Sequence, residues 1–416
     1  MTAGNKPAAE ERRQAALARA AQLRRRIADY LEAEKQIPTG ARIGDRIRAQ
    51  KRKILQILNG TEQDWNNWKW QMRNRITRIE ILAQFINLTQ AEIDQVNEAG
   101  KHFRWAVSPY YASLMDPDDP ACPIRKQAIP SIREVEDTCG SLDPMAEHWT
   151  SPAPAITRRY PDRLIINVTN QCAMYCRHCQ RRRNIGETDR QTPRKDLEAA
   201  LDYIRKNPEI RDVLITGGDA LLLDDNTLDW LLAELDNIAH VEIKRIGTRT
   251  PVTMPQRITD KLCAILEKHH PVYVNTQFNS PVEVTHEAAL ACARLAKAGV
   301  PLGNQSVLLA GVNDNPHVMK KLCQELLKIR VRPYYIFHAK NVKGTTHFMT
   351  SIQKGIEIME ALRGHTSGLA VPTYILNAPH GQGKTPILPD YLLWLTKEKA
   401  VLRTWENVVF EYPNEK

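Results

Sequence analysis

The sequence of 416 residues lacks any apolar run near the ~18 residues from which a membrane-spanning helix is recognised. Its first residues are charged and rich in alanine, so they do not have the pattern of a secretion signal. Three of its eight cysteines are clustered, and clustered thiolates oxidise outside a reducing compartment. These features predict a cytoplasmic protein with no membrane partner. With 42% hydrophobic residues, the chain can form one large catalytic domain with helical appendages.

Positive charge is concentrated at the start of the chain. Residues 1–60 hold 14 Lys and Arg against 6 Asp and Glu, whereas the whole chain has a net charge of +10. Apolar residues recur at helical spacing on both sides of Pro38, which predicts a basic extension of two helices. Its clusters Arg24–Arg26 and Lys51–Lys53 are compatible with nucleic acid, but a solvated face or a subunit contact is the commoner explanation. We therefore expect no nucleic-acid partner.

The cysteines Cys172, Cys176 and Cys179 have the spacing CxxxCxxC, directly after the β-type run Leu164–Val168. A structural zinc site needs four ligands, and no fourth cysteine lies nearby. The five others are scattered singly, at Cys122, Cys139, Cys263, Cys292 and Cys323. Three thiolates suit three corners of a [4Fe-4S] cube and leave the fourth iron open to a small molecule.

From Arg163 onward, apolar β-rich runs alternate with helix-like segments. The runs cover residues 164–168, 213–216, 241–246, 272–276, 305–309 and 332–337, and helical segments include 196–206, 228–237 and 316–329. Six such units predict an α/β fold, a partial (β/α)6 barrel whose chemistry gathers at the carboxyl ends of the strands. The cysteine loop follows the first strand.

Two glycine-rich turns offer further candidate sites. Gly217, Gly218 and Asp219 follow the second strand, where glycines let the backbone approach a ligand and the carboxylate can accept hydrogen bonds from an ammonium group. Lys384 ends the turn that begins at Gly381; a P-loop is excluded because it needs glycine at Ala378. Such a lysine suits a Schiff base with pyridoxal phosphate (PLP), although an ordinary exposed loop lysine is the commoner case.

Several motifs, in one order along residues 61–400, resemble the lysine 2,3-aminomutase family of radical S-adenosylmethionine (SAM) enzymes. Besides the cysteine motif, which resembles the CxxxCxΦC signature of radical SAM enzymes, the matching segments are 65–75, 159–163, 181–183, 249–252, 303–306, 363–368 and 381–384. The resemblance implies a radical SAM barrel and an isomerase that moves the α-amino group of an amino acid to its β-carbon. It also implies three cofactors, a [4Fe-4S] cluster, SAM and PLP.

The resemblance implies roles for single residues, position by position in the matching motifs. These are Cys172, Cys176 and Cys179 as cluster ligands; Gly217, Gly218, Asp219 and Gln305 as SAM contacts; Arg159 and Arg163 as contacts of the PLP phosphate; Lys384 as the catalytic Schiff-base lysine; and Arg181 as the partner of the substrate α-carboxylate. A guanidinium fork binds a carboxylate through two hydrogen bonds and so fixes its orientation.

Two positions depart from the lysine-specific enzymes. Lys340 and Asn377 stand where those enzymes place two aspartates around the distal ammonium of lysine, so two anions are replaced by a cation and an amide. A cation there repels lysine but suits a side-chain carboxylate. The pattern resembles the glutamate-specific members, and we expect L-glutamate to be converted to β-glutamate. Aminomutases acting on lysine, arginine or glutamine remain alternatives, as does a nucleic-acid-binding Fe–S protein, although that reading leaves Lys384 unexplained.

The sequence and its family resemblance together predict four regions of the chain and several binding partners. The regions are a basic helical extension (1–60), a helical region (61–155), the partial barrel (156–370) and a C-terminal segment with the PLP lysine (371–416). No zinc is expected, because Asn315 replaces a cysteine of the lysine enzymes and their cysteine-bearing tail has no counterpart here. The expected partners are a small amino acid substrate, a reductase, flavodoxin or ferredoxin as electron donor, and further copies of the chain in a homo-oligomer.

Overall fold

The computed structural model describes residues 9–414, which fall into two compact units divided between Ile37 and Pro38. The first unit contains α1 (Ala9–Arg25) and α2 (Ala28–Gln36). Residues 1–8 of the predicted extension lie outside the described residues. The helix α3 (Gly44–Ile57), which we expected in the same extension, belongs to the second unit, where Ile54 is fully buried. Within the described residues, no helix has both the length and the apolar character needed to cross a membrane.

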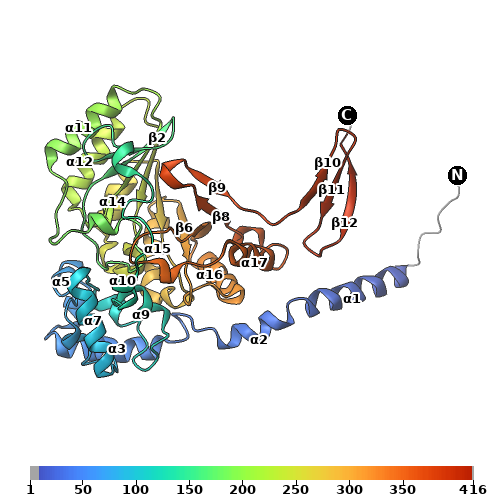
Figure 1. The fold of residues 1–416 in the computed structure, drawn as a ribbon, viewed down its shortest axis with the longest axis horizontal. Helices are drawn as coiled ribbons and strands as arrows, with labels where there is room; N and C mark the ends of the chain where they lie inside the picture. The colour runs from blue at the N-terminus through green and yellow to red at the C-terminus, as the bar shows by residue number, and fades with distance from the viewer. Residues whose placement is uncertain (1–8, 415–416) are drawn as a thin grey trace. The chain divides into compact units, whose positions relative to one another are not determined.

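Short helices precede the barrel in the second unit (Figure 1). They are α4 (Glu62–Trp65), α5 (Trp68–Arg73), α6 (Ile79–Leu82), α7 (Gln90–His102), α8 (Pro109–Ala112), α9 (Pro123–Ala128) and α10 (Arg133–Glu136). A capping box begins α4: the Thr61 hydroxyl accepts from the Asp64 amide at 3.2 Å, and the Asp64 carboxylate accepts from the Thr61 amide at 3.0 Å. Trp65 and Trp70 are buried in the same apolar core as the barrel strands, so packing explains these tryptophans.

Nine strands form one sheet in sequence order, and β2 to β8 run parallel. They are β1 (Ile156–Arg158), β2 (Arg163–Asn167), β3 (Asp212–Thr216), β4 (Ile243–Gly247), β5 (Val272–Thr276), β6 (Leu302–Leu308), β7 (Arg332–His338), β8 (Thr373–Asn377) and β9 (Lys384–Pro386). The six predicted strands are confirmed. The parallel strand β8 and the antiparallel edge strands β1 and β9 were not predicted.

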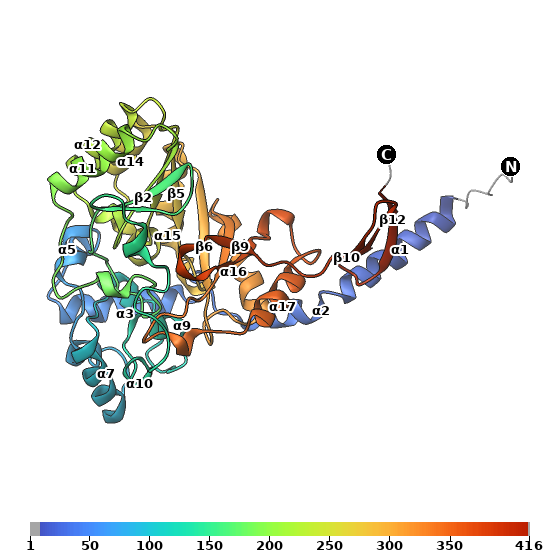
Figure 2. The same cartoon turned by 45° about the horizontal axis from the view of Figure 1, so that its top comes forward.

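Helices connect the parallel strands and cover the outer face of the sheet (Figures 1 and 2). They are α11 (Arg194–Arg205), α12 (Asp225–Asp236), α14 (Asp260–Lys268), α15 (His286–Lys297), α16 (Pro316–Lys328) and α17 (Ile352–Leu362). The short α13 (Thr250–Thr253) follows β4, and its Thr253 lines the cavity inside the sheet. Burial alternates strictly along β6. Leu302 and Leu308 are buried, whereas Gln305 and Val307 face the cavity inside the sheet.

The hairpin of β8 and β9 brings Lys384 into the barrel. Lys384 is the cross-strand partner of Asn377, although six residues separate them in the chain. Gly381 and Gly383 have φ angles of +76° and +105°, which side chains with a Cβ rarely adopt. The glycines thus form a defined turn that fixes Lys384 opposite the end of β8.

A separate antiparallel sheet ends the chain: β10 (Leu392–Leu395), β11 (Lys399–Arg403) and β12 (Val409–Pro413). It exposes several large apolar side chains, including Leu392, Trp394, Phe410 and Tyr412. Arg403 links it to α17 through an ion pair with Glu360 at 2.9 Å. Exposed apolar side chains in such number are typical of an interaction surface.

Gly355 of α17 lies directly against the buried ring of Tyr374 in β8. A Cβ added at Gly355 would lie 2.1 Å from the Tyr374 Cζ, and that ring is fully buried. We predict that Gly355→Ala lowers the free energy of unfolding by about 1–3 kcal/mol in denaturant titration. Gly368→Ala is the matched control, since nothing lies within 4 Å of its added Cβ. Equal stability of the two variants would contradict this account of the packing.

Candidate functional site

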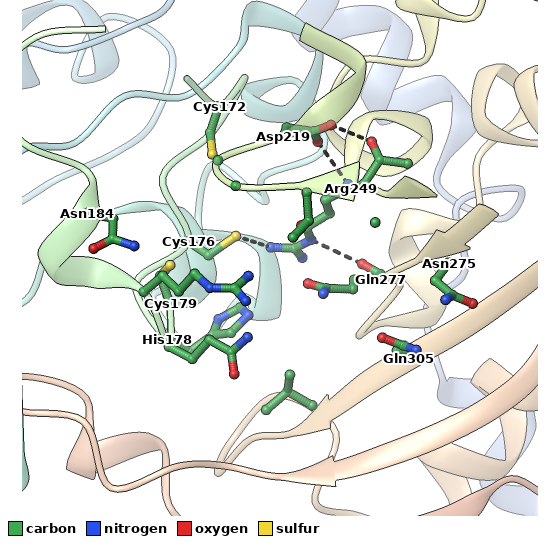
Figure 3. Close-up of a pocket in the computed structure, with 18 of the residues that line it drawn as sticks. Cys172, Cys176, His178, Cys179, Asn184, Asp219, Arg249, Asn275, Gln277 and Gln305 are labelled. Atoms are coloured by element: carbon green, nitrogen blue, oxygen red, sulfur yellow. Dashed lines mark hydrogen bonds between the residues drawn. The ribbon is translucent and has the colours of Figure 1, made fainter. Parts of the chain in front are cut away.

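One cavity at the carboxyl ends of the parallel strands is lined by all but one of the residues to which the sequence resemblance gave a role. These are Arg159, Cys172, Cys176, Cys179, Arg181, Gly217, Gly218, Asp219, Gln305, Lys340, Asn377 and Lys384. Figure 3 shows the three cysteines on one side of this cavity and Asn275, Gln277 and Gln305 on the other. The exception is Arg163, which begins β2 and does not line the cavity; its guanidinium stacks on Tyr160, 3.9 Å from the ring centre.

The cysteine loop follows β2 and carries three free thiols. Burial raises the pKa of the Cys172 thiol well above its ordinary value, and it also raises the pKa of Cys179. Buried thiols that share a cavity need a positively charged partner to become thiolates. An iron–sulfur cluster provides that charge, so this donor set fits the [4Fe-4S] group that the spacing predicts.

Arg249 also lines the cavity, and its guanidinium lies beside Cys176 (Figure 3). Its Nη1 donates to the Cys176 sulfur at 2.9 Å, and its Nη2 donates to Glu283 at 2.7 Å. Tyr111 donates to the same Glu283 oxygen at 2.6 Å. Glu283 is fully buried, so its carboxylate fixes the guanidinium toward the sulfur. In the sequence, Arg249 stood out only as part of a matching motif, without a role of its own.

Glycine is required at the two positions after β3 for a reason other than the predicted approach of the backbone to a ligand. A Cβ at Gly217 would lie 2.4 Å from the carbonyl oxygen of Thr169, and one at Gly218 would lie 2.3 Å from that of Gln171. The close approach that requires glycine is therefore to the backbone of the cysteine loop. Two hydrogen bonds join the loops, from Gly218 N to Thr169 O at 2.5 Å and from Asp219 N to Gln171 O at 2.7 Å. The two loops thus form one rigid wall.

Asp219 is bonded to the protein in this wall. Its carboxylate accepts from the Arg249 amide at 2.8 Å and from the Thr248 hydroxyl, and only 3% of the residue is exposed. Burial raises the pKa of the carboxyl. Gly217, Gly218, Asp219 and Gln305 all face the cavity, and their contact with SAM stays a prediction.

Lys384 lines the same cavity as the cysteines and lies among aromatic rings. Its Nζ is 5.7 Å from the Tyr160 ring centre and 5.6 Å from that of Tyr335. Although Lys384 is an exposed residue, partial desolvation by the surrounding protein and then the charges of Arg245 and Arg163 lower the pKa of Lys384 to about 8. A lysine of lowered pKa is a competent amine nucleophile for a carbonyl group, and the rings offer faces to a planar cofactor such as PLP.

Arg159 and Arg181 share a buried counter-ion, Glu147, which the sequence analysis missed. Arg159 Nη2 donates to Glu147 Oε1 at 2.7 Å and Arg181 Nε donates to the same oxygen at 3.1 Å, while Arg183 Nη2 donates to Oε2 at 2.9 Å. Burial alone would raise the pKa of the Glu147 carboxyl, but the three guanidinium groups hold that pKa below its usual value. Glu147 lies outside the matching motifs, so nothing in the sequence singled it out.

Lys340, which follows β7, and Asn377, which ends β8, both line the cavity. Burial, followed by the nearby charges of Arg181 and Arg159, lowers the pKa of Lys340 to about 7. Its ammonium donates to the Gln180 side-chain oxygen, a second contact that the sequence analysis missed. The Asn377 Nδ2 is buried and has no hydrogen-bond partner among the described residues. The wall thus combines a cation with an unpaired amide donor.

Comparison with known proteins gives two matching family models, the radical SAM superfamily at residues 166–323 and lysine-2,3-aminomutase at residues 359–416. A glutamate 2,3-aminomutase of Clostridioides difficile (strain 630) is 58% identical over 405 residues, which cover 97% of this chain and 96% of that protein. The L-lysine 2,3-aminomutase of Clostridium subterminale is 53% identical over 353 residues, 85% of each chain. The chain is thus similar to 2,3-aminomutases over nearly its whole length.

Lys384 should titrate at a lower pH than an ordinary lysine. We predict that modification of this residue by fluorodinitrobenzene, followed by peptide mass mapping, reaches half its maximal rate at pH about 8, because the reagent attacks only the neutral amine. In the unfolded chain the same residue should titrate near the ordinary lysine value of about 10.4. A midpoint above pH 10 in the folded protein would show that the site does not activate this amine.

Proposed function

Because this chain belongs to the lysine 2,3-aminomutase family of radical SAM enzymes, we propose that it moves the α-amino group of L-glutamate to the β-carbon with PLP as a second cofactor. The product is β-glutamate, and the enzyme is an isomerase. The observation that carries the substrate assignment is that Lys340 and Asn377 line the same cavity, one as a cation and the other as an unpaired amide donor. The relative from Clostridioides difficile, named for glutamate, supports the same assignment.

Three groups of residues suit the three cofactors. The [4Fe-4S] cluster would be held by Cys172, Cys176 and Cys179. SAM would lie against Gly217, Gly218, Asp219 and Gln305. PLP would be held by Lys384 and Arg159, and also by Arg163, which does not line the cavity. When bound, the cluster and SAM supply a carbon radical that removes hydrogen from the substrate, and PLP delocalises the unpaired electron. The protein supplies position and charge.

The two carboxylates of glutamate find matching cations at different places in the cavity. Arg181 uses only its Nε for Glu147, so its two terminal nitrogens have no acceptor in the part of the chain that the structure describes. This fork suits the α-carboxylate. Lys340, with a pKa of about 7, is half charged near neutral pH, and an incoming side-chain carboxylate favours its charged form.

Lysine is disfavoured by the same residues. Its distal ammonium would lie beside Lys340, and like charges in a water-poor cavity repel strongly. An ammonium group also has no hydrogen-bond acceptor for the amide N–H of Asn377. The chain therefore differs in specificity from its relatives that are named for lysine.

Partners form the last part of the proposal. A radical SAM reaction needs an external electron, so we include a reductase, flavodoxin or ferredoxin as donor and a reducing cytoplasm as the setting. We also propose a homo-oligomer, supported by the apolar side chains that β10 and β12 expose, Leu392, Trp394, Phe410 and Tyr412 among them. A second copy of the chain is the occupant that we assign to that surface.

The proposal is tested by anaerobic incubation of the reconstituted protein with SAM, PLP, a reductant and each of the twenty amino acids in turn. Amino-acid analysis should find a β-isomer from L-glutamate, with at least tenfold less from glutamine, lysine or arginine, because each mismatch leaves a buried polar group unpaired or two like charges together. Omission of PLP should abolish the product. A β-isomer from lysine and none from glutamate would overturn the substrate assignment.

Reversal of the charge in the cavity wall should reverse the preference. We predict that Lys340→Asp with Asn377→Asp lowers kcat/KM for glutamate at least tenfold and creates measurable activity with lysine. The matched control is Asn341→Asp with Lys343→Asp, which makes the same change in net charge at exposed neighbouring positions and should leave the preference unchanged. If the cavity variant still preferred glutamate, these two residues would not determine specificity.

A further inference from the structure

Glu147 is the buried carboxylate that joins the two anion-binding arginines of the site. Its Oε1 accepts from both Arg159 Nη2 and Arg181 Nε, at 2.7 and 3.1 Å, so one oxygen atom links the guanidinium groups. Only 6% of Glu147 is exposed, and it does not itself line the cavity. A buried carboxylate with two such contacts restricts each guanidinium to one orientation.

The arginines keep donors for other partners. The terminal nitrogens of Arg181 have no acceptor in the portion of the chain that is described, and the buried Nε of Arg159 has none either. Buried donors without a partner are costly unless a ligand satisfies them. Glu147 therefore leaves donors of both arginines available for anions.

The segment that carries Glu147 also contacts the loop that carries Lys384. His380 N donates to Pro144 O at 3.2 Å, and a Cβ at Gly381 would lie 2.9 Å from Met145 O. On its other side, the Ser151 hydroxyl donates to Glu147 O at 2.9 Å. The backbone around Glu147 is thus fixed relative to both the Schiff-base lysine and the arginines.

We propose that Glu147 is a positioning residue that fixes the guanidinium groups of Arg159 and Arg181 relative to each other. The phosphate of PLP and the α-carboxylate of the substrate then bind at a fixed separation. This inference rests on the proposed function. Because both anions belong to one linked cofactor–substrate unit during the reaction, a shift of either arginine misaligns the other end of that unit. Glu147 acts through the arginines and touches neither ligand.

A purely electrostatic role for Glu147 makes the opposite prediction. Three guanidinium groups meet this one carboxylate, so its removal makes the wall more positive and would strengthen the binding of anions. Loss of positioning instead weakens their binding. The direction of the change therefore separates the two roles.

The test measures the PLP dissociation constant of the full-length protein by absorbance, together with KM and kcat for L-glutamate in the reconstituted enzyme. In Glu147→Gln we expect the PLP constant and KM both to rise about tenfold or more, with a smaller change in kcat. Glu147→Asp keeps the charge but withdraws the oxygens by one methylene, and it should show the same pair of losses. Unchanged or tighter binding in both variants would overturn the proposal.

Glu134→Gln is the matched control for the loss of a buried carboxylate. Glu134 is fully buried and accepts from Arg177 and Arg182, but none of the three lines the cavity. This variant should lose stability in thermal unfolding without a change in the PLP constant, and a tenfold rise there as well would assign the effect to general destabilisation. If the wild type itself bound no PLP, the proposed function would fail, which is a result distinct from failure of the Glu147 assignment.

Discussion

The parallel pairing of β2 to β8 is the constraint on which the site depends. In a parallel sheet all strands end at the same edge, so the loops that follow them converge. The cysteine loop, the Gly217–Asp219 turn, Lys340 and Asn377 are widely separated in the sequence, and this pairing alone brings them to one cavity. The antiparallel addition of β9 then places Lys384 across from Asn377. Without β8 and β9 the cysteine loop would face an incomplete wall.

Charge is organised around the cavity in a way that suits anionic ligands. Arg159, Arg181, Lys340 and Lys384 all face it, and Glu147 compensates part of their charge from behind. Desolvation, and then the charges of neighbouring cations, lower the pKa of both lysines, so the protein holds partly neutral amines that gain charge when an anion arrives. The same arrangement excludes a second ammonium group. In the proposed function, substrate choice and amine reactivity thus arise from one electrostatic environment.

The sequence predicted the barrel strands because each is a short apolar run between helices with a regular apolar stripe. It missed β8, although Thr373–Asn377 is equally apolar, because the helix before it ends in a long irregular connection. Motif spacing located the cysteines and Lys384, since their chemistry needs particular residue types in particular order. It could not find Glu147 or Gln180, because a counter-ion is chosen by packing and any nearby carboxylate or amide in the sequence would have looked the same.

The proposed function requires that the cluster held by the three cysteines and the PLP held by Lys384 share one cavity. The most direct test is the ³¹P NMR signal of PLP bound to the reconstituted protein, recorded with the cluster diamagnetic and then reduced to its paramagnetic state. If the two groups share the cavity, that signal broadens strongly on reduction. It does not broaden in a Cys176→Ala variant, which lacks the intact cluster. A sharp signal in the reduced wild type would show that the two groups lie far apart, and it would contradict the account.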